Sequence, residues 1–138
     1  MQRTREPDTT ITLFTNVALI IKSRMQRAVP LPFAQHQALC FVSDHEKPGM
    51  QDVAEYLKIA APSATFLIEE LVHGGYLSRM SDAKDRRKVQ LALTRKGVRA
   101  SKLIAQKRAR VLGGMVRSLK EADRKQLDRI LKLIIQNA

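Results

Sequence analysis

The sequence predicts a single, mainly α-helical domain that carries one small β-hairpin, and therefore an α+β fold. Apolar residues recur at helical spacing along most of the 138 residues. The apolar period changes to two within residues 76–93, as it does in short strands. Hydrophobic residues make up 44% of the chain, which is enough for one modest core but not for two.

Two helices are expected in the first third of the chain. The predicted helix over residues 9–29 has two apolar stripes, and these are formed by Ile11, Phe14, Ala18, Ile21 and Met25 and by Leu13, Val17 and Ile20. A surface helix needs only one stripe, so this pattern predicts burial against its own domain and against a second subunit. Pro30 and Pro32 separate this helix from the next one, over residues 33–45.

A pair of shorter helices follows, over residues 51–58 and 62–74. The second has a buried stripe at residues 64, 67, 68 and 71, and its opposite face presents Ser63, Thr65, Phe66, Glu69 and Glu70. The candidate DNA-contacting residues of this helix are Pro62, Ser63, Thr65, Phe66 and Glu69. In a helix-turn-helix, the second helix enters the major groove and its early residues contact base edges. The helical pattern alone fits a small helical hairpin without DNA equally well.

A β-hairpin is expected next, with strands over residues 76–80 and 89–93 around a polar loop. The loop is too long for a two-residue turn, so its tip should project and bring its basic residues to phosphates or a minor groove. Asp82 and Asp85 are expected to cap the turn and orient the arginines. The basic residues of the tip are Lys84, Arg86, Arg87 and Lys88. A simple solvated loop is the alternative. The order of these elements predicts a winged helix-turn-helix.

The C-terminal third is expected to be helical. Thr94 can cap a long helix over residues 95–117, in which Gly113-Gly114 allows a kink or a break. The last predicted helix, residues 121–137, carries more apolar surface than a terminal helix needs. We expect the first and last helices to form a homodimer interface through Ile11, Phe14, Ile21, Leu127, Ile130, Leu131 and Ile134.

The net charge of +12 lies in one continuous part of the chain. Residues 79–96 hold seven basic and two acidic side chains, and residues 97–120 hold seven basic and none acidic. A localised positive charge attracts a polyanion, because each neutralised phosphate releases counterions. The charge therefore favours double-stranded DNA as a partner, although a basic surface that only aids solubility has the same composition.

Other classes of protein find little support in the sequence. Residues 1–8 lack the apolar core of a signal peptide, and no apolar run is long enough to cross a membrane. The single cysteine, Cys40, lies among apolar neighbours and is expected in the core, which suits a cytoplasmic protein. The histidines have no metal-ligand spacing, and no phosphate loop or nucleophile elbow is present. We therefore expect neither an enzyme, a metal nor a cofactor.

The chain resembles the MarR family of bacterial transcription regulators over nearly its whole length. The segment from Asp82 to Gly97 fits the family's wing pattern D-x-R-D-x-R, an alternating strand and L-T-x-x-G. Residues 52–71 and Gly75-Tyr76-Leu77 match its DNA-binding helices. The resemblance implies a homodimer that binds DNA with two recognition helices and two wings. It also implies a small anionic or aromatic effector between the dimerisation and DNA-binding regions.

The chain departs from the family pattern at several positions. A lysine replaces the first wing arginine, and the recognition helix has no basic residue from 61 to 72. The departures are Lys58 for glycine, Ala60 for a capping Ser or Thr, Phe66 and Glu70 for basic residues, and Lys84 for arginine. Without an arginine on this helix, we expect an A·T-rich inverted-repeat operator.

Two functions remain open at this stage. The first is a repressor that is released from its operator by a small ligand, with residues 33–96 as the DNA-binding lobe and residues 9–29 with 97–138 as the dimerisation region. The second is a ligand-sensing or protein-interaction relative that has lost specific DNA binding. Lys107 and Arg108 interrupt the apolar stripe of the long helix, where they either line an anion cavity or face solvent or DNA.

Overall fold

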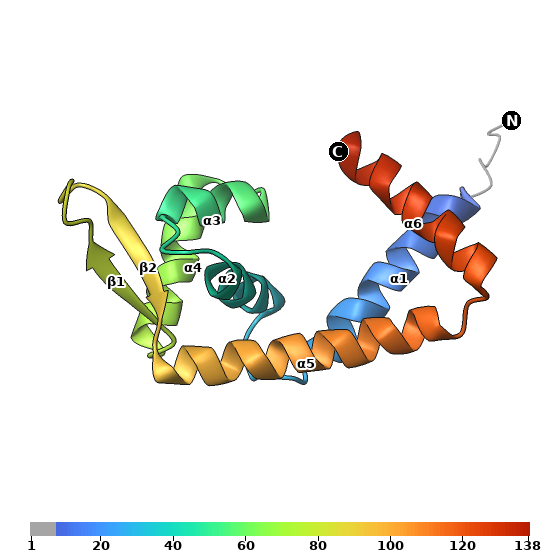
Figure 1. Cartoon of the computed structure of the whole chain (residues 1–138), viewed down its shortest axis with the longest axis horizontal. Helices are drawn as coiled ribbons and strands as arrows, with labels where there is room; N and C mark the ends of the chain where they lie inside the picture. The colour runs from blue at the N-terminus through green and yellow to red at the C-terminus, as the bar shows by residue number, and fades with distance from the viewer. Residues whose placement is uncertain (1–7) are drawn as a thin grey trace, which may run out of the picture.

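The structure is a computed structural model that describes residues 8–138 of the chain. The sequence expectation about a signal peptide concerns residues that mostly lie outside this range. In Figure 1, a lobe that includes the β-hairpin and a pair of terminal helices stand at opposite ends of one long helix. The elements are α1 (Thr9–Met25), α2 (Phe33–Asp44), α3 (Met50–Leu57), α4 (Ala61–His73), β1 (Leu77–Ser81), β2 (Val89–Leu93), α5 (Arg95–Arg117) and α6 (Glu121–Gln136). This arrangement confirms the predicted winged helix-turn-helix fold.

The core joins α2, α4, the hairpin and the first half of α5 into one lobe. Burial of these side chains removes apolar surface from water and holds α3 and α4 in a fixed relation to the hairpin. The fully buried large side chains include Leu39, Ile68, Leu71, Leu77, Leu91 and Ile104. Cys40 is buried in this core, as expected, and burial raises the pKa of its thiol.

The strands pair in an antiparallel register that matches Leu77 with Leu93 and Arg79 with Leu91. Residues 48–49 extend the hairpin, because Gly49 forms a bridge with Gln90 and the Leu91 N–H donates to the Pro48 carbonyl at 2.8 Å. The turn between α2 and α3 is therefore tied to the second strand. This tie fixes the orientation of the wing against the helix-turn-helix.

The first helix is shorter than predicted, since it ends at Met25 and not at residue 29. Val29 precedes Pro30, and a residue before proline is disfavoured in the α conformation. The Val29 carbonyl also faces the ring of His36 at 3.0 Å from Nε2, and the Leu31 N–H donates to the same carbonyl at 2.7 Å. These contacts turn the chain from α1 into α2.

The long helix α5 continues through Gly113-Gly114 to Arg117, so the glycines do not break it. Thr94 caps its start as expected, since its hydroxyl oxygen accepts the Gly97 N–H at 3.0 Å. No helix within residues 8–138 is long and apolar enough to span a membrane. The described residues also contain no cluster of three or more potential metal-ligand side chains.

Candidate nucleic-acid interface

The recognition helix α4 buries the predicted stripe and exposes the predicted face. Ala64, Leu67, Ile68 and Leu71 are buried, and Phe66 on the opposite side is 68% exposed. All five predicted recognition residues lie at the surface of α4, namely Pro62, Ser63, Thr65, Phe66 and Glu69. Its N-cap is Ala60, which offers no side-chain hydrogen bond, as the sequence predicted.

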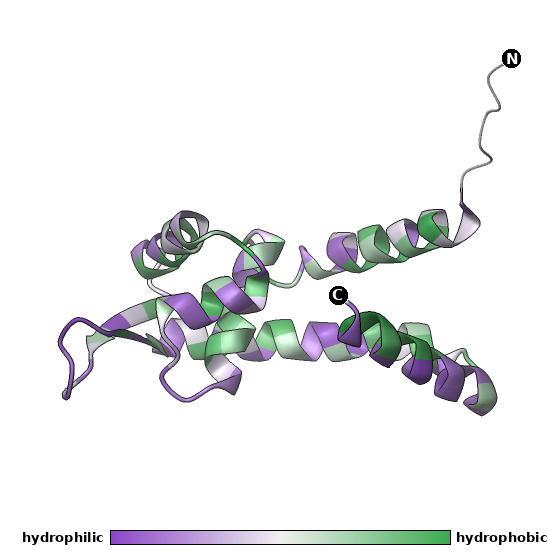
Figure 2. Ribbon diagram, turned by 90° about the horizontal axis from the view of Figure 1, so that it is seen from above, coloured by the Kyte–Doolittle hydropathy of each residue, from purple (hydrophilic) through white to green (hydrophobic). Residues whose placement is uncertain are grey.

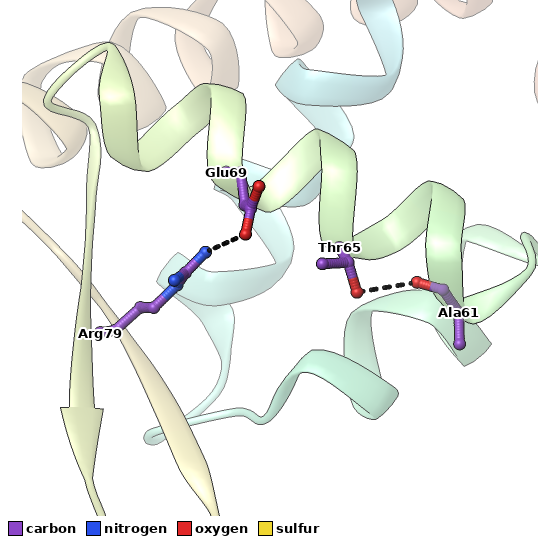
Figure 3. A network of polar contacts seen from close by, with 4 residues as sticks. All are labelled: Ala61, Thr65, Glu69 and Arg79. Carbon is purple, nitrogen blue, oxygen red and sulfur yellow. Dashed lines mark hydrogen bonds and ion pairs between the residues drawn. The ribbon is translucent and has the colours of Figure 1, made fainter.

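Thr65 has a defined hydrogen-bonding role on this face. Its hydroxyl donates to the Ala61 carbonyl at 3.0 Å, one turn earlier in the helix (Figure 3). Because the hydroxyl proton is used within the helix, the side chain can offer a ligand its oxygen lone pairs and its methyl group. Thr65 is thus suited to accept a hydrogen bond or to contact an apolar group such as a thymine methyl.

Arg79 lies beside the recognition helix, although it is not among the residues predicted from the sequence. Its Nη2 donates to Glu69 Oε1 at 3.1 Å, so an arginine from β1 is brought to the face of α4 (Figure 3). The helix that lacks basic residues therefore has one next to it. Strand alternation is the sequence signal that would have identified Arg79. It places Arg79 on the same strand face as the buried Leu77, and therefore on the side of the hairpin that packs toward the helices.

The wing loop is held by its two aspartates. Asp82 Oδ1 accepts the Lys84 N–H at 2.9 Å, and Asp85 Oδ1 accepts the Arg87 N–H at 3.0 Å. The loop is closed by backbone bonds from Asp82 N to the Lys88 carbonyl and from Lys88 N to the Asp85 carbonyl, both at 3.0 Å. The predicted capping role of Asp82 and Asp85 agrees with these contacts.

The basic side chains of the wing tip are exposed, namely Lys84, Arg86, Arg87 and Lys88, while Asp85 is half-buried. Within residues 8–138 the ion pairs are Arg79–Glu69 and Lys125–Glu121, and neither includes these four cations. Their charge is therefore available to a polyanion. The wing extends away from the lobe at the far end from α1 and α6 (Figure 1).

The two terminal helices expose their apolar residues. No residue of α6 is buried, and Met25 is the one buried residue of α1. Figure 2 shows α1 and α6 as separate helices, each with many hydrophobic residues. Of the predicted dimerisation residues, Ile21 and Leu127 are half-buried, while the exposed ones are Ile11, Phe14, Ile130, Leu131 and Ile134. Exposed apolar residues that the prediction omitted include Leu19 and Ile135.

A small pocket of about 190 Å³ lies between the segment that follows α1 and the middle of α5. Its lining contains three cations and no carboxylate, and consists of Arg27, Ala28, Leu103, Gln106, Lys107 and Arg110. Lys107 therefore lines a cavity, which was one of its two predicted placements. Arg108 does not line it and lies close enough to Cys40 to favour the thiolate, although burial of the thiol outweighs this effect.

Comparisons with known proteins agree with this geometry. The model of the MarR family matches residues 31–89. Comparison with curated protein sequences finds no match. Among solved structures, the Staphylococcus aureus MepR–DNA complex is 19% identical, with 95% of this chain and 99% of that chain covered at a TM-score of 0.85.

Two further solved structures have the same fold. The transcriptional regulator SlyA is 20% identical and covers 94% of each chain at a TM-score of 0.83. Staphylococcus aureus MepR bound to ethidium bromide is 19% identical, with 94% of this chain and 96% of that chain covered at a TM-score of 0.61. The MarR family model therefore matches residues 31–89, and the chain as a whole shares the winged helix-turn-helix fold of these solved regulators.

Proposed function

We propose that this protein is a transcriptional regulator, acting as a repressor, that binds double-stranded DNA as a homodimer. One observation carries the proposal: an exposed recognition helix lies beside a projecting wing. The four cations of this wing have no ion-pair partner within residues 8–138. Such a surface fits a major groove and the phosphates or minor groove beside it. The likeness to MepR, which has been solved in complex with DNA, supports the same function.

The proposed dimer uses the exposed apolar faces of α1 and α6. Many exposed large apolar side chains on two helices of a folded chain are typical of an interaction site. In a homodimer, two-fold symmetry would place two recognition helices and two wings on an inverted-repeat operator. We propose residues 33–96 as the DNA-binding lobe, and residues 9–29 with 97–138 as the dimerisation region.

We further propose that a small anionic ligand regulates DNA binding from the pocket between α1 and α5. Arg27, Lys107 and Arg110 would neutralise the anion, and Leu103 would contact an apolar or aromatic portion of it. The pocket joins the dimerisation arm to the helix that supports the DNA-binding lobe. A ligand there would favour one orientation of the lobe relative to the arm.

The test is binding of the full chain to DNA duplexes selected from a random pool, measured by fluorescence anisotropy over a range of salt concentrations. We expect an inverted-repeat consensus and an affinity that falls steeply with salt, because Lys and Arg release counterions from phosphates. Two wings with four cations each predict a slope of log K against log salt on the order of −7 if every cation contacts a phosphate.

The same experiment tests the second function. A protein that has lost specific DNA binding would give no consensus, and its affinity for selected and random duplexes would be equal. That result would reject the repressor and favour a ligand-sensing or protein-interaction role. Titration of the DNA complex with salicylate as an aromatic anion tests the ligand, and release by salicylate should weaken in Lys107→Ala.

A further inference from the structure

We propose that Arg79 is a specificity-determining residue of the DNA-binding surface, where Glu69 holds it to read a guanine in each half-site. This inference rests on the proposed DNA-binding function and adds a residue to it. Arg79 donates to Glu69 at 3.1 Å, and both side chains remain accessible, with exposed fractions of 41% and 57%. Arg79 belongs to β1, ten residues beyond the residue of α4 that it contacts.

The position of Arg79 follows from the register of the hairpin. Arg79 pairs with Leu91, and Leu77 pairs with Leu93. Residues two apart on a strand lie on the same sheet face, so Arg79 shares a face with the buried Leu77. That face packs on α4. Along this face, Leu77 is buried in the core and Arg79 is exposed at its edge. The Arg79 side chain therefore lies against the recognition helix, where it contacts Glu69.

The partner of Arg79 lies on the outward side of α4. Successive residues of a helix are rotated by about 100°, which places residues 62, 66 and 69 on one line opposite the buried stripe. Glu69 thus lies beside Phe66, the exposed large hydrophobic residue of this helix. A guanidinium held at Glu69 reaches the surface that would enter a major groove.

The Arg79–Glu69 pair has the properties of a preorganised contact. An ion pair at this exposure contributes little to folding stability, so stability does not account for it. The bond to Glu69 uses one N–H of the guanidinium, and four others remain for a ligand. A guanidinium fixed in advance loses less conformational entropy on binding than a flexible one.

The chemistry of this pair favours a G·C base pair. Arginine donates two hydrogen bonds to O6 and N7 of guanine, and a carboxylate accepts one from the cytosine amino group. Arg79 and Glu69 together present both kinds of group. A recognition helix without arginine led to the expectation of an A·T-rich operator. With Arg79 beside this helix, we expect that operator to contain one G·C pair in each half-site.

The test compares the sites selected from a random duplex pool by the full-length wild type, by Arg79→Ala and by Arg79→Lys. We expect a guanine at one position of each wild-type half-site. In Arg79→Ala this preference should disappear while the other positions are retained, and affinity for the wild-type consensus should fall by about 10- to 100-fold. Arg79→Lys keeps the charge without the planar fork, and should restore non-specific affinity but not the guanine preference.

Lys125→Ala is the matched control, because Lys125 is also an exposed cation in an ion pair, with Glu121 at 3.2 Å. Lys125→Ala should leave the consensus unchanged. Any loss of affinity that it causes should be the same for all duplexes, and should be no larger than the loss that Arg79→Ala causes for random duplexes. Circular dichroism and thermal melting would show that each variant is folded. Glu69→Gln should reduce the guanine preference partially, since it weakens the hold on Arg79.

Two outcomes would overturn the proposal. If Arg79→Ala retains the guanine preference, Arg79 does not read bases. If it lowers affinity equally for consensus and random duplexes, Arg79 contacts phosphate only. Both outcomes leave a wild type that binds selectively, so they differ from failure of the proposed function, in which the wild type itself selects no site.

Discussion

At the scale of single residues, two backbone positions constrain how the winged lobe is built. Gly97, in the first turn of α5, lies against the carbonyl of Tyr76, so that a Cβ at this position would be 2.0 Å from the carbonyl oxygen. Lys58, which follows α3, adopts a left-handed conformation with φ of 57°. The first position requires a glycine, and the second tolerates a lysine at an energetic cost.

We expect Gly97→Ala to destabilise the protein by about 1–3 kcal/mol, since the contact is with backbone and the new methyl group must push the hairpin from α5. Urea denaturation measures the change in the free energy of unfolding. Gly114→Ala is the control, because nothing lies within 4 Å of a Cβ there. It should stabilise α5 by about 0.5–1 kcal/mol. Equal stability of the two variants would contradict the close approach at Gly97.

We expect Lys58→Gly to stabilise the protein by about 0.5–1 kcal/mol, because glycine adopts a positive φ without the steric cost that lysine carries. The added entropy of glycine in the unfolded chain limits the gain. Thermal melting and urea denaturation both report it. Lys58→Ala removes the same charged side chain but keeps the Cβ, and should give no gain. A similar gain in both variants would assign the effect to charge.

At the scale of elements, the hairpin is fastened at both ends and free at its tip. Lys96 of α5 donates to the Gly74 carbonyl at 2.7 Å and lies over the Tyr76 ring at 4.4 Å, which ties the start of α5 to the end of α4. The bonds of Asp82 and Asp85 then shape the loop between the strands. The wing therefore has a hydrogen-bonded loop with exposed cations at its tip, which suits contact with DNA backbone or minor groove.

The double variant Arg86→Ala/Arg87→Ala should bind DNA more weakly and with a shallower salt dependence. Loss of Arg87 alone should cost about 1–3 kcal/mol of binding free energy if it reads the groove. Fluorescence anisotropy at several salt concentrations measures both effects. Lys125→Ala/Lys132→Ala removes two exposed cations of α6 instead and should change little. An unchanged affinity in the wing variant would remove the wing from the mechanism.

At the scale of the whole molecule, the two ends of α5 have opposite surfaces. One end carries the winged lobe with its exposed basic tip, and the other carries α1 and α6, which expose large apolar side chains (Figure 1). On α1, Ile11 is 65% exposed, and on α6, Ile135 is 74% exposed. Water disfavours such surfaces, and a second copy of the same chain can cover them with its own α1 and α6.

We expect the wild type to sediment as a dimer at micromolar concentration, and Ile130→Glu/Ile134→Glu to give monomers or insoluble chain. Charged residues in an apolar interface carry a large desolvation cost. Lys132→Glu is the control, because residue 132 lies on the opposite side of α6 from residues 130 and 134. It should remain dimeric. A stable, folded wild-type monomer at high concentration would refute the proposed assembly.

Local patterns in the sequence were sufficient for most of the fold and for much of the candidate site. Helical spacing predicted the buried stripe of α4, and the change of period predicted the hairpin within about a residue. Turn chemistry predicted the capping roles of Asp82 and Asp85, and Thr94 was predicted to start α5. These features depend on neighbours within a few residues, so the sequence by itself determined them.

The tertiary structure decided the features that depend on contacts between distant segments. The first helix ends at Met25, and the Val29 carbonyl beyond it meets His36 of the next helix. Lys107 instead of Arg108 reaches the pocket because of how α5 packs. Arg79 meets Glu69 only because the strand register directs it onto α4. Periodicity specifies which face of an element is apolar, whereas packing and register determine which polar groups that face brings together.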